Sequence, residues 1–168
     1  MDNTRVEQLV QRKVDTATMI MRVLAVGAAV VLSLFSLWAM SYFGLVFVFA
    51  IVYCAMFLFK MTMVEYEYLL VNNELSIDII YNKEKRKHCC SFNVKEAEIF
   101  APIESDRVHN YLHNEKIIGK NYTSGEEGMR VYVLVVNSEQ TMVKLFIEPN
   151  EKLFEGIKSY IPRKTYTE

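Results

Sequence analysis

The chain has 168 residues, of which 52% are hydrophobic, and its formal net charge at pH 7 is −1. That length allows one ordinary domain with a little chain to spare, and the apolar fraction is higher than a soluble domain needs. The sequence contains no G-x-x-x-x-G-K, G-x-G-x-x-G or G-x-S-x-G motif and no basic stripe interleaved with aromatic residues. We therefore expect no enzymatic activity, no bound cofactor and no nucleic-acid binding.

Residues 1–22 form a leader of mixed charge. Thr4 and Glu7 have the spacing of a helix capping box. Apolar residues recur near helical spacing along the leader, at Val6, Leu9, Val10, Val14 and Ala17. The pattern predicts an amphipathic helix that lies along the cytoplasmic surface of a membrane.

A long uncharged segment follows the leader. From Val23 through Phe59, 37 consecutive residues include no Asp, Glu, Lys, Arg or His. A single helix of that length would extend about 55 Å, whereas the hydrocarbon core of a bilayer is about 30 Å thick. The chain must therefore reverse, and we place the reversal at Ser41–Gly44, just after Trp38, because such aromatics collect at membrane interfaces. Residues 23–60 are predicted to form a two-helix transmembrane hairpin.

Positive charges flank this segment and are missing from its expected turn. Arg5, Arg12, Lys13 and Arg22 precede the first helix, and Lys60 follows the second. Because cytoplasmic flanks carry an excess of Lys and Arg, we expect two spans of the plasma membrane with both termini in the cytoplasm.

From residue 61 to residue 168 the pattern changes to alternation of apolar and polar residues, which is typical of strands with one buried face. Residues Asn72–Glu74 and Asn82–Lys85 have turn composition, and a further turn is predicted at Asn137–Gln140. The predicted strands are Val64–Val71, Leu75–Tyr81, Lys87–Phe92, Ala97–Ile103, Arg130–Val136 and Thr141–Ile147.

A terminal amphipathic helix is expected after Glu148–Glu151, where a proline and acidic residues mark a helix start. Its apolar stripe comprises Leu153, Phe154, Ile157, Tyr160 and Ile161, and Pro162 ends it. A helix with one apolar face must cover another element, so we expect it to close the sheet.

A run of antiparallel hairpins closed by one terminal helix resembles the pleckstrin-homology-like (PH-like) fold. The hairpin anchor together with VEYEYLLVNNELSIDIIYNKEKRK, EIFAPIES and EPNEKLFEGIKSYIPRK resembles an uncharacterised family of bacterial membrane proteins that carry such a module. The resemblance implies a membrane-anchored α+β protein of the bacterial inner membrane. Its PH-like domain would be a mainly antiparallel β sandwich or barrel with a C-terminal helix as its cap.

The basic stretch Lys83, Lys85, Arg86 and Lys87 falls at a predicted hairpin turn. One interpretation is a solvated turn, since charges at a strand edge oppose aggregation. The other is contact with anionic lipid, because basic residues on an early hairpin grip phosphoinositides in eukaryotic PH domains and this module is tethered to a bilayer. From Lys60 onward the chain has 15 Lys and Arg against 17 Asp and Glu, so no basic face is guaranteed.

Cysteine and histidine residues offer weaker signals. Neighbouring strand residues face opposite sides, so we expect one of Cys89 and Cys90 in the core and the other exposed, while Cys54 belongs to the second span. His109 and His113 would share a helical face, but a zinc site would need a further ligand, for which His88 and Cys89 are the obvious candidates.

We expect a non-enzymatic, membrane-anchored interaction or scaffold module that presents its PH-like domain to a protein partner, through a strand edge or the excursion over residues 104–128. The alternative is an anionic-lipid sensor that uses the basic residues of 83–87. A metal-binding module through His109 and His113 is the remote alternative.

Overall fold

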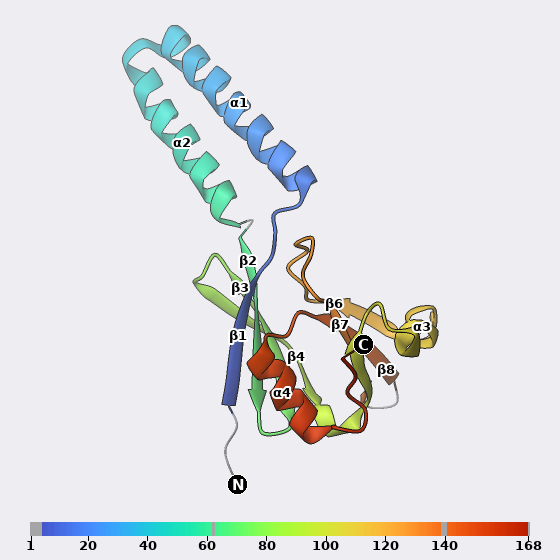
Figure 1. The fold of residues 1–168 in the computed structure, drawn as a ribbon. Coiled ribbons are helices and arrows are strands. Elements are labelled where there is room, and N and C mark those ends of the chain that lie inside the picture. The colour runs from blue at the N-terminus through green and yellow to red at the C-terminus, as the bar shows by residue number, and fades with distance from the viewer. Residues whose placement is uncertain (1–4, 62, 139–140, 168) are drawn as a thin grey trace.

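The computed structural model describes residues 5–61, 63–138 and 141–167. Figure 1 shows two apolar helices that project from one end of a β-rich body. The body contains two four-stranded sheets and two further α-helices. The predicted α+β fold with antiparallel sheets is therefore confirmed.

Strand β1 (Arg5–Gln11) stands where the leader helix was expected. It pairs antiparallel with β2 (Val64–Val71), from Arg5 opposite Val71 to Gln11 opposite Glu65. The leader-helix prediction is wrong for these residues, because Val6 and Val10 also have the period of a strand and pairing with β2 buries Val10. Residues 1–4, including Thr4 of the predicted capping box, lie outside the described residues.

Helix α1 (Thr16–Met40) and helix α2 (Gly44–Met61) are joined by a short 3₁₀ helix, η1 (Ser41–Phe43). They lie side by side and run in opposite directions (Figure 1). The segment Thr16–Ala39 is long and apolar enough to cross a membrane, and Gly44–Phe57 is a shorter apolar helix. The reversal falls at the predicted residues.

Gly44 has a specific role in this reversal. A Cβ atom at this position would lie 2.5 Å from the carbonyl oxygen of Ser36, so only glycine allows the two helices to approach there. The Ser36 hydroxyl also donates to the Gly44 carbonyl oxygen at 3.1 Å.

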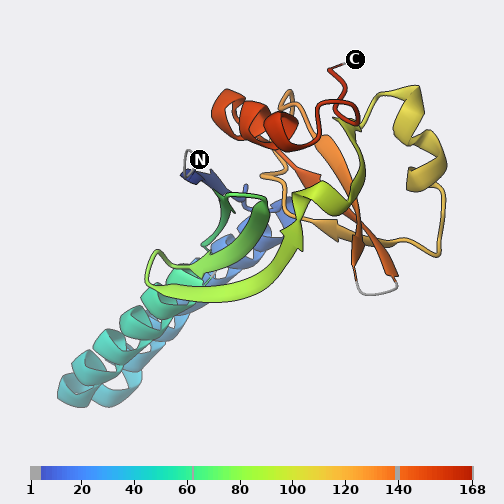
Figure 2. The ribbon, with the colours of Figure 1, turned by 90° about the horizontal axis from the view of Figure 1, so that it is seen from below.

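The first sheet has the strand order β1-β2-β3-β4, with β3 at Glu74–Tyr81 and β4 at Lys85–Asn93. The second has the order β5-β7-β8-β6, with strands at Ala97–Pro102, Tyr132–Ser138, Thr141–Ile147 and Ile118–Asn121. Figure 2 shows the two sheets side by side. A 3₁₀ helix, η2 (Val94–Glu96), connects β4 to β5.

The predicted excursion over residues 104–128 is more regular than the sequence suggested. It contains helix α3 (Asp106–Leu112) and β6, which pairs in parallel with β8. Of the predicted turn Asn137–Gln140, residues 139 and 140 lie outside the described residues.

Helix α4 (Glu151–Tyr160) closes the body as expected. Asn150 caps its start by accepting a hydrogen bond from the Leu153 backbone at 2.8 Å. Its apolar face enters the core shared by both sheets, with Leu153 and Ile157 fully buried. At Gly156 a Cβ atom would lie 2.9 Å from the Leu70 side chain, so glycine permits the close approach to the first sheet.

The side chain of Gln8 fastens β1 to the start of α4. Its amide nitrogen donates to the Glu148 carbonyl oxygen at 2.7 Å, and its amide oxygen accepts from the Asn150 backbone at 2.8 Å. The β-rich body therefore begins at β1, and the expected domain boundary at residue 61 leaves out its first strand. The helices α1 and α2 are an insertion between two paired strands.

Strand β1 is expected to be required for stability. Lys13 lies just after the end of β1, and Met63 lies just before the start of β2. An Asn-Gly turn between these two residues can therefore replace α1 and α2. This helix-deleted variant consists of residues 1–13 joined to residues 63–168. It should melt cooperatively, and its melting temperature should be more than about 5 °C above that of residues 63–168 alone, because the shorter fragment lacks β1 and its buried Val10. Differential scanning calorimetry measures both.

A matched pair of substitutions controls for the added chain length. In the helix-deleted variant, Val10→Ser should lower the melting temperature towards that of the shorter fragment, whereas Gln11→Ser, at an exposed position, should change it little. Equal melting temperatures with and without β1 would contradict the role given to this strand.

Candidate functional site

The basic turn lies at the end of the body from which α1 and α2 project. Asn82 and Lys83 have left-handed backbone angles, with φ of 54° and 59°. The Asn82 backbone nitrogen donates to the carbonyl oxygen of Met63 at 2.9 Å, and Met63 follows the end of α2 by two residues. Figure 1 shows this connection between β3 and β4 beside the lower end of α2.

The four predicted lipid-contact residues differ in their partners. Arg86 pairs with the buried carboxylate of Glu67 at 2.8 Å, and Lys83 lies 3.9 Å from Glu65. In the described part of the chain no ion pair is found for Lys85 or Lys87, and both are exposed. The structure thus divides the four cations: Lys83 and Arg86 have acidic partners, whereas Lys85 and Lys87 form no ion pair among the described residues.

Glu67 sits on the outer face of the first sheet and is only 3% exposed. It is opposite Leu9 on β1 and opposite Asp78 on β3. One carboxylate oxygen binds Arg86, and the other has no hydrogen-bond partner. Burial raises the pKa of Glu67, the neighbouring Glu7 side chain adds to the increase, and the Arg86 charge opposes it.

The candidate metal ligands do not come together. The rings of His109 and His113 stack with centroids 4.2 Å apart at the end of α3. His88 instead bonds Asp78 on the neighbouring strand at 2.8 Å. Within residues 5–61, 63–138 and 141–167, no group of three or more His, Cys, Asp or Glu side chains could hold a metal ion.

The two adjacent cysteines lie on a β-bulge. Ile77 is opposite Cys90 and Asp78 is opposite His88, so Cys89 is the additional residue on β4. Both sulfur atoms contact the hydroxyl of Tyr122, at 3.0 Å from Cys89 and 3.2 Å from Cys90. Cys90 packs half-buried against the core and Cys89 is exposed, in line with the expectation, but the two thiols do not face opposite sides because the bulge breaks the alternation of the strand.

Burial governs the chemistry of this sulfur cluster. It raises the pKa of the Cys90 thiol, and it is also the largest cause of the raised pKa of Tyr122. Cys89 is exposed, and Cys54 is exposed on α2. A raised pKa lowers the fraction of Cys90 that is present as the nucleophilic thiolate at neutral pH.

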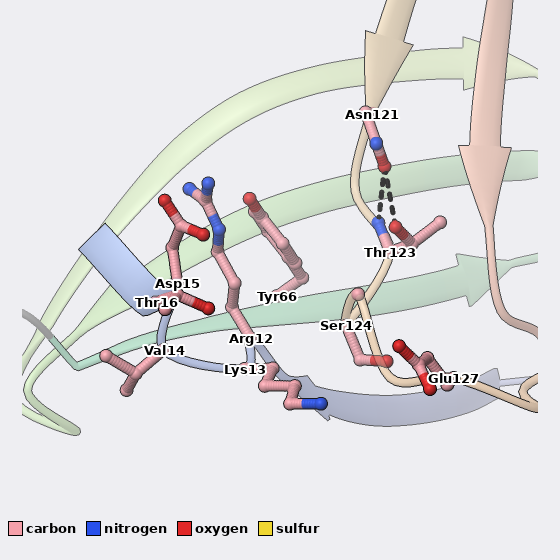
Figure 3. Close-up of a pocket in the computed structure, with 11 residues that line it drawn as sticks. Arg12, Lys13, Val14, Asp15, Thr16, Tyr66, Asn121, Thr123, Ser124 and Glu127 are labelled. Atoms are coloured by element: carbon pink, nitrogen blue, oxygen red, sulfur yellow. Dashed lines mark hydrogen bonds between the residues drawn. The ribbon is translucent and has the colours of Figure 1, made fainter. Parts of the chain in front are cut away.

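A polar pocket of about 420 Å³ opens at the same end of the body as the basic turn. One wall is the linker from β1 to α1, residues 12–16, and the other is the loop after β6, residues 121–127 (Figure 3). The Lys13 backbone nitrogen donates to the Ser124 carbonyl oxygen at 2.7 Å and joins the two walls. Tyr66 of β2 also lines the pocket.

Over residues 2–167 the chain matches the model of a family described as a bacterial PH-like domain, DUF6106. The chain belongs to this family. The match includes β1 and both apolar helices as well as the strands that follow. No curated protein and no solved structure gave a match.

Sequence reasoning missed the pocket of this PH-like protein. Its two walls are more than a hundred positions apart in the chain, and the first was assigned to a leader helix. The only local signal was the polar composition of Asn121–Glu127, which indicated a loop but no ligand. The basic turn, by contrast, was found from composition alone.

The raised pKa of Glu67 predicts how stability depends on pH. The folded state holds the Glu67 proton to higher pH than the unfolded state does, so ionisation destabilises the fold as pH rises above the ordinary value of 4.5. Glu67→Gln removes this effect. The melting temperature of this variant relative to the parent protein should therefore increase from pH 4 to pH 7.

Thermal melts of the full chain in detergent, at matched ionic strength, give this difference. Glu65→Gln, on the same strand and face but less buried, is the matched control. If the melting temperature of Glu67→Gln relative to the parent protein stays constant or decreases from pH 4 to pH 7, ionisation of Glu67 does not destabilise the fold.

Proposed function

We propose that this bacterial PH-like protein is a non-enzymatic module anchored in the plasma membrane by α1 and α2, with both termini in the cytoplasm. It holds its basic turn against the anionic surface of the bilayer. The observation that carries the proposal is the hydrogen bond from Asn82 to Met63, which places the turn beside the end of α2.

The surface of the two helices supports membrane anchoring. Most of their apolar side chains point outwards, and those near the reversal include Trp38, which is 84% exposed, and Tyr42, which is 93% exposed. A soluble protein rarely exposes so large an apolar surface. Aromatic residues at the reversal are typical of a membrane–water interface.

The short connections between the helices and the body support close contact with lipid. Only residues 12–15 separate β1 from α1, and β2 begins at Val64 after α2 ends at Met61. The body therefore cannot move far from the ends of α1 and α2. Arg12, Lys13 and Arg22 lie at this same end, so positive charge gathers where the cytoplasmic headgroups would be.

The unpaired state of Lys85 and Lys87 supports a role for the turn in lipid contact. An ammonium group already bound to a carboxylate gains little from a phosphate, whereas an unpaired one near an anionic surface gains about 1 kcal/mol. Arg86 instead stabilises the buried Glu67. Lys85 and Lys87 are thus the residues to which we assign the contact.

Presentation of the domain to a protein partner is the second candidate. A groove next to α3 is lined by Pro102, Ile103 and Met129, among others. Ile103 and Met129 are 37% and 52% exposed. Exposed apolar side chains that flank a groove, one of them an adaptable methionine, favour the binding of an apolar peptide segment.

A vesicle-binding measurement separates the two candidates. The helix-deleted variant should bind vesicles containing anionic phospholipid, and its affinity should fall steeply with salt. Lys85→Gln combined with Lys87→Gln should weaken binding roughly tenfold or more without changing the melting curve. Lys95→Gln with Lys152→Gln, which removes the same charge away from the turn, is the control.

Two outcomes would redirect the assignment. If vesicle affinity is weak at physiological salt and insensitive to both pairs of substitutions, the turn only maintains solubility and the peptide-binding groove becomes the first candidate. If both pairs weaken binding equally, net charge rather than the turn determines the attraction.

The orientation of the anchor can be checked by cysteine labelling in a variant that lacks the native cysteines. Tyr42→Cys, at the reversal, should react with an impermeant maleimide from outside intact cells. Gln11→Cys and Thr167→Cys should react only after the membrane is opened, because both lie on the charged side of the helices. Gly44 is unsuitable, since a Cβ atom there would collide with Ser36. External labelling of either end of the chain would contradict the orientation.

A further inference from the structure

The pocket between the β1–α1 linker and the β6–β7 loop is lined by side chains of both charges. Arg12 and Lys13 supply two cations, and Asp15 and Glu127 supply two carboxylates. Figure 3 shows Arg12 and Asp15 on one side of the pocket and Glu127 on the other. The formal charge of these four residues sums to zero.

Among the described residues, no ion pair involves Arg12, Lys13, Asp15 or Glu127. Because four unpaired charges surround one cavity, the occupant that gains most is one that presents both a negative and a positive group.

Hydrogen bonds within the β6–β7 loop hold one wall of the pocket in place. The side chain of Asn121 accepts hydrogen bonds from the backbone and hydroxyl of Thr123 at 2.9 and 2.8 Å. Ser124 accepts a bond from the Glu126 backbone at 3.0 Å, and Gly125 takes a left-handed φ of 76°. A loop held by its own hydrogen bonds costs little conformational entropy when a ligand binds.

The backbone fixes the opposite wall as well. Arg12 donates to the Val64 carbonyl oxygen at 3.0 Å, and Lys13 donates to that of Ser124 at 2.7 Å. The Asp15 carbonyl oxygen accepts from Met19 at 2.9 Å as the first turn of α1 forms. The charged linker is therefore continuous with α1, which places the pocket at headgroup depth if α1 crosses the bilayer.

We infer that this pocket binds a zwitterionic aminophosphate, a primary ammonium joined to a phosphate by a short alkyl chain, as in the phosphoethanolamine headgroup of a phospholipid. Arg12 and Lys13 would bind the phosphate, and Asp15 and Glu127 would accept hydrogen bonds from the ammonium. A ligand with only negative charge would meet two carboxylates without compensation. The headgroup source of this ligand rests on the proposed membrane anchoring.

Native mass spectrometry of the full chain in detergent tests this inference with three lipids of the same acyl chains. Phosphatidylethanolamine should bind at least about tenfold tighter than phosphatidylcholine, whose trimethylammonium cannot donate hydrogen bonds, and tighter than anionic phosphatidylglycerol. Equal affinity for the two zwitterionic lipids, or a preference for phosphatidylglycerol, would overturn the assignment.

Paired substitutions assign the preference to the pocket. Asp15→Asn with Glu127→Gln should abolish the preference for phosphatidylethanolamine, and asparagine is as well tolerated as aspartate just before a helix. Glu126→Gln with Glu115→Gln removes two exposed carboxylates that do not line the pocket and should preserve the preference. If the preference survives the first pair, the pocket is not its source.

Competition with soluble glycerophosphoethanolamine distinguishes a lipid from a free headgroup. If it displaces the lipid at similar concentrations, the chemistry is supported and the ligand is the free molecule; if it does not, the ligand is the lipid. The proposed anchoring is tested separately by washing membranes at alkaline pH, since release of the chain would show that it is not an integral membrane protein. A chain that stays in the membrane yet shows no headgroup preference refutes the pocket assignment alone.

Discussion

Pairing of β1 with β2 is the constraint on which the rest of the structure depends. The two strands lie before and after the apolar helices, so the chain must leave the sheet, pass through α1 and α2 and return to the neighbouring position. The bond from Arg12 to Val64 at 3.0 Å holds the two connections together. The helices are therefore obliged to run side by side in opposite directions, and the compact reversal at Gly44 meets this requirement.

The same pairing determines the electrostatics of the outer sheet face. β2 becomes an interior strand, flanked by β1 and β3, and its Glu67 is consequently buried. A buried carboxylate needs a partner, and Arg86 on β4 supplies one at 2.8 Å. Since successive strand residues alternate in direction, Lys85 and Lys87 point away from the side that Arg86 occupies. Neighbouring cations in the basic stretch thus divide between structural and surface roles.

Much of the fold follows from local sequence patterns, and the exceptions have identifiable causes. Val64–Val71 and Thr141–Ile147 were predicted with the observed bounds, because each strand has alternating residues and a clear turn at one end. β1 was misassigned because Leu9 completed a helical stripe, yet Leu9 is 57% exposed and the strand buries Val10 instead. The sequence of β1 is compatible with both helical and strand periodicity, and pairing with the distant strand β2 selects the strand.

The candidate site was less predictable than the fold. Composition located the basic turn, but the division of its cations depends on Glu67, which lies on another strand. The shared contact of Cys89 and Cys90 with Tyr122 depends on a β-bulge that the residue types in this strand do not predict. The pocket depends on a contact between Lys13 and Ser124, residues far apart in the chain. Such features arise from tertiary packing and have no signature in periodicity.

Under the proposed membrane anchoring, the direct attachment of the body to α1 also lowers the affinity that its surface contacts need for the bilayer. A domain on a flexible tether loses translational and rotational freedom each time it meets the membrane, whereas here the short connections have already restricted that freedom. Individually weak headgroup contacts can then fix the orientation of the body. Because the bond of 2.7 Å from Lys13 to Ser124 joins the start of α1 to the pocket loop, a tilt of α1 that displaces Lys13 also displaces that loop. Under the proposed anchoring, the position of α1 in the bilayer would therefore be coupled to the shape of the pocket.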